Sequence, residues 1–291
     1  MPELPEVETI ARGLAKRVSG DVIESIWLGE KPEILKSPAS EIATALENTR
    51  ILTVRRIGKH IVFDLERVAR TLLSEKRQKS KSPRKESPAL QAHSQFIVHL
   101  GMTGRLQVCD PQSEIPKHTH ATAKLASGRE LRFVDPRRFG RLSVAVAGDF
   151  AAAGIEPLEA DLGRFIPLFR GRKTPIKSAL LNQKLLRGVG NIYADESLFR
   201  AGIRSRRRAS TITRDQLAKL FTSIQEVLRE AIALGGSSIS DYVDADGEEG
   251  FFQLQHRVYG REGEPCLVCK SLIKRVVIAG RSSHYCPKCQ K

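Results

Sequence analysis

Four cysteines near the carboxyl end constrain the fold of this chain more than any other feature. They form two C-x2-C pairs, Cys266 with Cys269 and Cys286 with Cys289, separated by sixteen residues. This spacing is typical of a four-thiolate zinc site and favours zinc over a disulfide pair or a redox C-x-x-C motif. Residues 275–285, between the pairs, have the pattern of two strands joined by an Ala-Gly turn. A segment of about 35 residues has too small a core to fold alone, so we predict a zinc ribbon held by one structural Zn2+.

The opposite end of the chain carries a candidate nucleophile. Residues 2–7 read Pro-Glu-Leu-Pro-Glu-Val, and Pro2 is small enough for removal of Met1 to be expected. Removal leaves a secondary α-amine, whose pKa of about 7.7–8.0 makes it far more available as a free base than a lysine. Such an amine attacks electrophilic carbon and forms an iminium ion. The alternative is that proline and glutamate merely suit the first turn of a helix, and this segment alone favours that alternative.

The charge of the chain indicates a polyanionic partner. Its 48 Lys and Arg residues exceed its 33 Asp and Glu residues, which gives a net charge of +15 and an isoelectric point near 9.9. Nucleic acid is favoured over membrane, because no basic amphipathic helix with an aromatic face is evident. Residues 67–94 hold eight basic and two acidic residues. The centre of this segment reads as a flexible loop that either adds salt-sensitive attraction to phosphate or adds nothing.

The fifth cysteine and the lack of long apolar runs indicate the cellular compartment in which the protein works. The fifth cysteine, Cys109, is unpaired and follows an apolar strand pattern, so we expect a buried structural thiol. The sequence has neither a signal peptide nor an apolar run near the roughly 18 residues of a membrane span. We therefore expect a soluble protein in a reducing compartment.

Hydrophobic patterning divides the rest of the chain into a β part and a helical part. Residues 3–18 carry one helical apolar stripe, and residues 22–146 alternate as strands punctuated by glycines. After residues 154–157 the pattern becomes helical. A two-layer β domain with an N-terminal helix fits the first part.

Three helices are predicted in the second part. The first two, at 176–186 and 191–199, are joined by the glycine-rich turn 187–190, whose backbone N–H groups suit a phosphate. Thr213-Arg-Asp-Gln216 is a capping-box pattern that starts the third helix, and Gly235-Gly236 ends it.

Together these residues resemble the bacterial formamidopyrimidine-DNA glycosylase family (8-oxoguanine DNA glycosylase/AP lyase, Fpg/MutM), nearly from end to end. The matching segments are MPELPEVET (1–9), GKHIVFDL (58–65), HLGMTGRL (99–106), KHTH (117–120), FVDPRRFG (133–140), GVGNIYADESLF (188–199), DADGEEGFF (244–252), VYGREGEPC (258–266) and the four-cysteine ribbon. The resemblance implies an α+β multidomain fold. Its parts are an N-terminal helix with a two-layer β-sandwich (residues 2–150), a helix-two-turn-helix domain (151–254) and a C-terminal four-Cys zinc ribbon (257–291).

The resemblance also implies a chemistry, in which oxidised purines such as 8-oxoguanine and formamidopyrimidines are excised from flipped-out nucleotides. Pro2 would attack C1′ and expel the base, Glu3 would transfer a proton to the sugar, and Glu6 would position groups in the same pocket. Lys59 would contact phosphate and help β-elimination. Arg281, at the tip of the zinc hairpin, would grip phosphates and assist δ-elimination.

A further set of residues would hold the DNA. Met102, Arg137 and Phe139 match the family's three residues that fill the gap left by the flipped nucleotide, with Arg137 facing the orphaned cytosine. The residues that would bind DNA as positioning contacts are Asn191, Lys177, Arg172, His118 and Arg138. The loop expected to cap the lesion starts near 235–241 and varies within the family, so lesion preference is implied less firmly than the chemistry.

Two other functions stay open at this point. One is a glycosylase of the endonuclease VIII type acting on oxidised pyrimidines, against which the opening PELPEVE stands. The other is a non-catalytic zinc-ribbon DNA-binding protein. The resemblance implies a cytoplasmic bacterial monomer, acting at the nucleoid on damaged double-stranded DNA, with no membrane partner.

Overall fold

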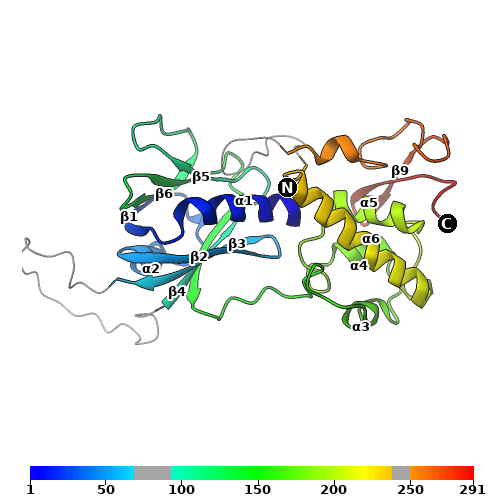
Figure 1. The fold of residues 1–291 in the computed structure, drawn as a ribbon, viewed down its shortest axis with the longest axis horizontal. Helices are drawn as coiled ribbons and strands as arrows, with labels where there is room; N and C mark the ends of the chain where they lie inside the picture. The colour runs from blue at the N-terminus through cyan, green and yellow to red at the C-terminus, as the bar shows by residue number, and fades with distance from the viewer. Residues whose placement is uncertain (69–92, 238–249) are drawn as a thin grey trace, which may run out of the picture.

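The computed structural model describes residues 1–68, 93–237 and 250–291. Most of the basic segment 67–94, and most of the expected lesion-capping loop, lie outside the described residues. Figure 1 shows a β-rich body built by the first half of the chain beside a helical body built by the second half. The helix α1 (Leu4–Val18) begins at the boundary with the helical body and runs into the β-rich body.

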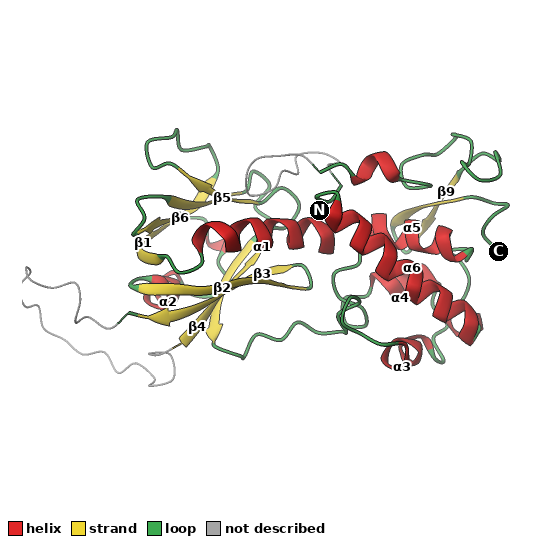
Figure 2. Cartoon of the chain, in the orientation of Figure 1, coloured by secondary structure: helices red, strands yellow, loops and turns green. Residues whose placement is uncertain are grey.

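Eight strands form the β-rich body as far as the structure describes it. They are β1 (Val22–Leu28), β2 (Thr49–Ile57), β3 (His60–Arg67), β4 (His93–His99), β5 (Arg105–Cys109), β6 (Thr119–Leu125), β7 (Glu130–Val134) and β8 (Arg141–Val146). Hydrogen bonds join them in the order β5-β7-β6-β1-β2-β3-β4-β8. Because β1 and β2 share two residue pairs whereas β2 and β3 share eight, the sheet divides between β1 and β2 into two four-stranded halves. Figure 2 shows these halves as two layers, which confirms the predicted two-layer β fold.

One hydrophobic core fills the space between the halves and α1. It includes Ile23 and Phe133 from one half, Phe63 from the other, and the predicted stripe of α1 at Val7, Ile10, Leu14 and Val18. The short helices α2 (Ala39–Leu46) and η1 (Pro32–Ile34) were not predicted from the sequence. Ile42 and Leu46 of α2 are fully buried in the same core.

The helical body has its own core. Its elements are α3 (Leu162–Phe165), η4 (Ile166–Phe169), α4 (Ile176–Leu181), α5 (Asn191–Ala201), η5 (Ala209–Thr211), α6 (Arg214–Ala233) and η6 (Phe252–Gln255). The capping box of α6 is confirmed, since Thr213 and Gln216 exchange hydrogen bonds of 3.3 and 3.2 Å. The helix predicted over 176–186 is wrong in its second half. It ends at Leu181, because the Asn182 side chain accepts the Lys184 N–H at 3.0 Å and turns the chain.

Helix α1 takes part in both cores. Leu4, at its first turn, packs with the helical body, whereas Val7 and the later stripe residues pack in the β-rich body. The Leu4 N–H donates to the Gly188 carbonyl at 3.0 Å. The amino terminus is therefore fixed at the junction of the two bodies.

The C-terminal ribbon has the predicted form. Its strands β9 (Lys274–Ile278) and β10 (Arg281–Tyr285) pair antiparallel around a turn in which Ala279 and Gly280 have φ of 48° and 75°. Positive φ at both central residues is the hairpin geometry that matches strand twist. Within the described part of the chain, no helix is long and apolar enough to cross a membrane.

Candidate active site and nucleic-acid interface

Residues distant in sequence converge at the amino terminus. The terminal amine interacts electrostatically with Glu3, Glu6, Lys59 and Arg137. Burial lowers the pKa of this amine, and the two carboxylates oppose that shift. The structure retains Met1, so Pro2 is here the second residue, partly buried, and its amine would become the terminus once Met1 is removed.

Glu3 is held by the start of α5. Its two carboxylate oxygens accept the N–H groups of Gly190 at 2.8 Å and of Ile192 at 3.0 Å. Burial raises the pKa of Glu3 to about 7, against the opposing effect of Lys59. A carboxyl group with this pKa is present in both protonation states at neutral pH, which suits proton transfer. Gly190 leaves no room for a side chain, because a Cβ there would lie 2.3 Å from Glu3 Cδ.

Glu6 is a structural centre of the same cluster. It accepts the N–H of Glu3 at 2.8 Å, the N–H of Ser237 at 2.8 Å and the hydroxyl of Tyr193. Gly236 is needed nearby, since a Cβ at that position would lie 3.0 Å from Glu6 Cγ. Glu6 therefore ties α1 to α5 and to the residue that follows the Gly235-Gly236 turn.

Lys59 lies on the turn between β2 and β3 and is buried. Burial lowers the pKa of its amine, Glu3 and Glu6 oppose the shift, and Arg281 adds to it. Arg281 itself is exposed at the tip of the zinc hairpin. Of the five residues predicted to be catalytic, the structure thus brings Glu3, Glu6, Lys59 and Arg281 into one electrostatic neighbourhood, with the chain terminus among them.

Lys177 requires a correction. Its side chain is fully buried, pairs with Asp195 at 2.7 Å and donates to the Ser282 carbonyl at 2.6 Å. Asp195 also accepts the Ser283 hydroxyl at 2.9 Å and the His284 N–H at 2.8 Å. The amine therefore fastens the zinc hairpin to the helical body, and the prediction that it binds phosphate directly does not fit this geometry.

The three predicted gap-filling residues are exposed on two neighbouring loops. Met102 is 42% and Phe139 48% exposed, and the Arg137 guanidinium lies 5.1 Å from the Phe139 ring centre. Buried Asp135 joins the two loops by accepting the Thr103 hydroxyl at 2.6 Å and the Gly140 N–H at 2.7 Å. Large apolar side chains held exposed on a fixed loop pair are available to enter a DNA stack.

The other predicted DNA contacts lie at the surface or close to it. His118 is exposed with φ of 70°, Arg172 is exposed, and Arg138 pairs with Glu33 at 2.9 Å. Asn191 is partly buried at the start of α5 and donates to the Ser282 hydroxyl at 3.3 Å.

The four paired cysteines fit one zinc ion. Their sulfur atoms all lie within 4.8 Å of one another, close to the roughly 3.8 Å edge of a tetrahedron with 2.3 Å Zn–S bonds. Cys266 and Cys286 are buried in the small ribbon core with Phe199, Val258 and Ile273. A closed four-thiolate set leaves no open position, so the ion is structural.

Comparison with known proteins identifies the family. The formamidopyrimidine-DNA glycosylase N-terminal domain matches residues 1–142, the H2TH domain of the same glycosylase matches 154–243, and the zinc finger found in FPG and IleRS matches 263–291. The chain belongs to the formamidopyrimidine-DNA glycosylase family. It is thereby a DNA glycosylase of base-excision repair.

Individual relatives match over their whole length. The formamidopyrimidine-DNA glycosylase of Solibacter usitatus is 44% identical and that of Desulfitobacterium hafniense 40%, each over 100% of both chains. The MutM (FPG) protein of Thermus thermophilus has a TM-score of 0.81 at 38% identity, covering 99% of this chain and 98% of that one. Lactococcus lactis Fpg in complex with abasic-site DNA has a TM-score of 0.83 at 31% identity, with 99% of each chain covered.

Sequence reasoning missed three residues that organise this glycosylase site. Asp135 and Tyr193 lie inside the matching segments FVDPRRFG and GVGNIYADESLF, yet nothing local marks them as partners of a loop or of Glu6. Glu156, whose carboxylate accepts the N–H of Gly58 beside Lys59 at 3.4 Å, was noted only as part of a boundary between the β and helical parts. The role of each of these residues depends on a contact with a residue distant in sequence, which no local sequence pattern shows.

Proposed function

We propose that this protein is a bifunctional glycosylase and AP lyase that removes oxidised purines from duplex DNA through an iminium intermediate at Pro2. The convergence of the amino terminus with Glu3 and Lys59 carries the proposal. A pure DNA-binding protein has no use for a buried carboxyl group of raised pKa beside a terminal amine.

The first steps use the amine and Glu3. Once the nucleotide is flipped out, the Pro2 nitrogen forms a bond to C1′, and the C1′–base bond breaks with its electron pair leaving on the base. The proton that the Pro2 nitrogen loses on forming this bond balances the negative charge of the expelled base. Protonated Glu3 delivers its proton to the ring oxygen of the sugar, which opens the ring and leaves a Pro2–C1′ iminium ion. Its pKa of about 7 makes this proton available at neutral pH.

Two eliminations follow. Loss of a proton from C2′ converts the iminium ion into an enamine, whose electron pair expels the 3′ phosphate and re-forms a conjugated iminium ion. Loss of the C4′ proton then expels the 5′ phosphate. Lys59 contacts phosphate and helps the first elimination, while Arg281 grips the phosphates and helps the second. A one-nucleotide gap flanked by phosphates remains, and water releases the sugar remnant from Pro2.

The remaining predicted residues bind the duplex. Met102, Arg137 and Phe139 fill the gap, and Arg137 faces the orphaned cytosine. The groups that hold backbone phosphate are Asn191, Arg172, His118 and Arg138. Lys177 acts behind this surface by fixing the hairpin that carries Arg281. The protein acts as a monomer in the bacterial cytoplasm.

An action on oxidised pyrimidines is the second candidate. A Lactococcus lactis Fpg structure, 31% identical to this chain, was solved with oxidised-pyrimidine-containing DNA. Parallel assays on 8-oxoguanine and 5,6-dihydrouracil duplexes separate the two candidates, and we expect the purine lesion to be cut faster.

Borohydride trapping tests the chemistry. Mature protein on an 8-oxoguanine:cytosine duplex is expected to give a covalent complex, whereas Pro2→Gly, which has a primary terminal amine, and a form that keeps Met1 serve as comparisons. Loss of trapping only in the Met1-retaining form assigns the nucleophile to the α-amine of residue 2. Absence of any complex from Zn-loaded mature protein would reject the enzyme and favour a binding-only protein.

A further inference from the structure

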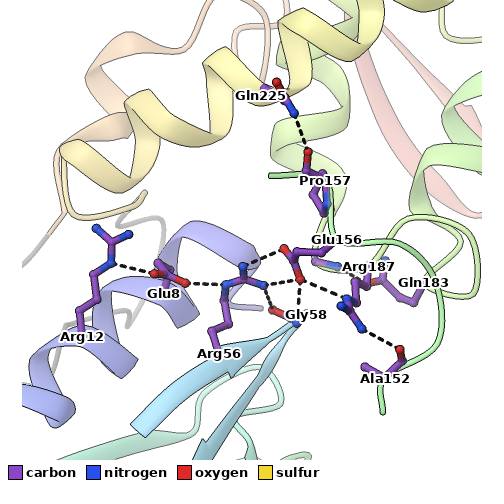
Figure 3. Close-up of polar contacts among 11 residues, drawn as sticks. Glu8, Arg12, Arg56, Gly58, Ala152, Glu156, Pro157, Gln183, Arg187 and Gln225 are labelled. Carbon is purple, nitrogen blue, oxygen red and sulfur yellow. Dashed lines mark hydrogen bonds and ion pairs between the residues drawn. The ribbon is translucent and has the colours of Figure 1, made fainter. Parts of the chain in front are cut away.

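A buried charge cluster joins the two bodies behind the candidate site (Figure 3). The Arg56 guanidinium donates to both oxygens of Glu156, at 2.7 and 3.0 Å, and to Glu8 at 2.8 Å. Arg187 donates to Glu156 at 3.1 Å from the other side. The side chains of Arg56 and Glu156 are each 5% exposed. Burying charges this deeply costs desolvation free energy, so such a cluster is weak evidence for stability. A role in fixing geometry is the alternative reason for its presence.

Glu156 belongs to the helical body. On one side of it, the Arg187 N–H donates to the Ile155 carbonyl at 3.1 Å. On the other side, the Gln225 amide of α6 donates to the Pro157 carbonyl at 3.0 Å. The backbone of Glu156 is therefore held on both sides, and its carboxylate projects towards the β-rich body from a fixed position.

The same carboxylate reaches the turn that carries Lys59. It accepts the Gly58 N–H at 3.4 Å, and Arg56 donates to the Gly58 carbonyl at 3.1 Å. Gly58 has φ of 60°, and a Cβ there would lie 3.3 Å from Arg187 Cβ. The peptide groups on both sides of Gly58 are thus fixed by the cluster, and Lys59 is the next residue.

The cluster also touches the turn that holds Glu3. Arg187 immediately precedes Gly188, whose carbonyl accepts the N–H of Leu4, and Gly190 of the same turn donates to Glu3. The Glu156 carboxylate therefore accepts hydrogen bonds from the first residue of two turns. One is the Gly58 N–H, in the turn that bears Lys59, and the other is the Arg187 side chain, in the turn that caps Glu3.

We propose that Glu156, together with Arg187, is a positioning pair that sets the location of Lys59 relative to the terminal amine. This inference rests on the function proposed above. Neither residue touches substrate; both act through the Gly58 peptide. A displacement of about 1 Å in a reacting group lowers a rate roughly 100-fold.

Two variants and one matched control test the proposal. Glu156→Gln keeps the volume and removes the charge that both arginines share, and Arg187→Met keeps the aliphatic stem over Gly58. Arg12→Met is the control, because Arg12 pairs with Glu8 at 2.7 Å at the exposed end of the same chain of charges and does not contact the turn. Each Zn-loaded, mature protein is given a preformed abasic-site duplex. The trapped fraction with borohydride and the rate of strand cleavage are then measured separately.

The expected result is a cleavage rate lowered roughly 100-fold in Glu156→Gln and roughly 10-fold in Arg187→Met, with an unchanged trapped fraction and an unaffected control. Adding either change to Lys59→Met should lower the rate no further, because residues that act through one group are not additive. Rates equal to the control, losses additive with Lys59→Met, or a fall in the trapped fraction alone would overturn the positioning role. Arg187→Met decides the matter if Glu156→Gln fails to fold. A wild type that neither traps nor cleaves would instead reject the proposed function, and this inference with it.

Discussion

The raised pKa of Glu3 makes a testable prediction about stability, in which the variant is Glu3→Gln. The Glu3 carboxyl group has a pKa of about 7 in the folded protein against 4.5 when unperturbed. The folded state therefore holds this proton more tightly than the unfolded state, so stability is lost as pH rises from about 4.5 to 7. This difference in pKa corresponds to a loss of stability of roughly 3 kcal/mol at pH 8.5 and of well under 1 kcal/mol at pH 4.

Glutamine imitates the protonated acid. Both have one carbonyl oxygen to share between the N–H groups of Gly190 and Ile192, so the two proteins should differ little in stability at pH 4. At pH 8.5 the variant escapes the cost of a buried negative charge, and we expect it to be more stable by about 3 kcal/mol. The same variant should lose base excision, since it has no proton to deliver.

Urea unfolding followed by far-ultraviolet circular dichroism measures the difference. The single tryptophan, Trp27 in β1, is 55% exposed in the folded protein and is therefore a poor reporter of unfolding. At pH 8.5 the midpoint for Glu3→Gln should exceed that of the wild type by roughly 1 M, and at pH 4 the two should nearly coincide. A constant offset between the two proteins across this pH range would refute the raised pKa of the buried Glu3 carboxyl group. A less stable variant at pH 8.5 would refute it as well.

Two further variants have simple outcomes. Gly190→Ala should lower base excision at least 100-fold with little change in DNA binding. The backbone at this position is extended, and the three atoms nearest the added Cβ all belong to the Glu3 side chain, with Cδ at 2.3 Å. Single-turnover kinetics and a binding isotherm together check this prediction. Lys177→Met should lower stability by about 3–5 kcal/mol, since it leaves Asp195 buried without its cation, and should leave the salt dependence of DNA binding unchanged. A weaker salt dependence of DNA binding in Lys177→Met would show that Lys177 contacts a phosphate directly after all.

Local sequence patterns correctly predicted those parts of the fold that depend on residues close together in the chain. The zinc ribbon follows from the spacing of Cys266, Cys269, Cys286 and Cys289, and the start of α6 follows from its capping box. The helix α2 was missed because eight residues carry too little periodicity to stand out from the strands around them. The domain boundaries at 150 and 254 stay a prediction.

The site depends on contacts that no local pattern contains. Glu3 meets Gly190 across 187 residues of sequence, and Glu6 meets Ser237 across 231. Sequence reasoning named Glu3, Glu6 and Lys59 through the family resemblance, but not what holds them. It also predicted that Lys177 binds backbone phosphate, because a lysine near the start of a short helix gives no sign that it will be buried against Asp195.

The burial of Lys177 and of Glu156 has the same physical cause. A charged side chain becomes buried where a second part of the chain docks over it. Glu156 of the helical body meets Arg56 of the β-rich body, and the Lys177–Asp195 pair of the helical body is covered by the zinc hairpin, which supplies the Ser282 carbonyl, Ser283 and His284. The partner is set by docking of the bodies, which sequence patterns within one body do not encode. The proposed catalysis by a terminal amine needs groups from the helical body and the hairpin brought to one point. Buried charges at both junctions therefore fix geometry that an apolar contact, which is non-directional, would leave free to slide.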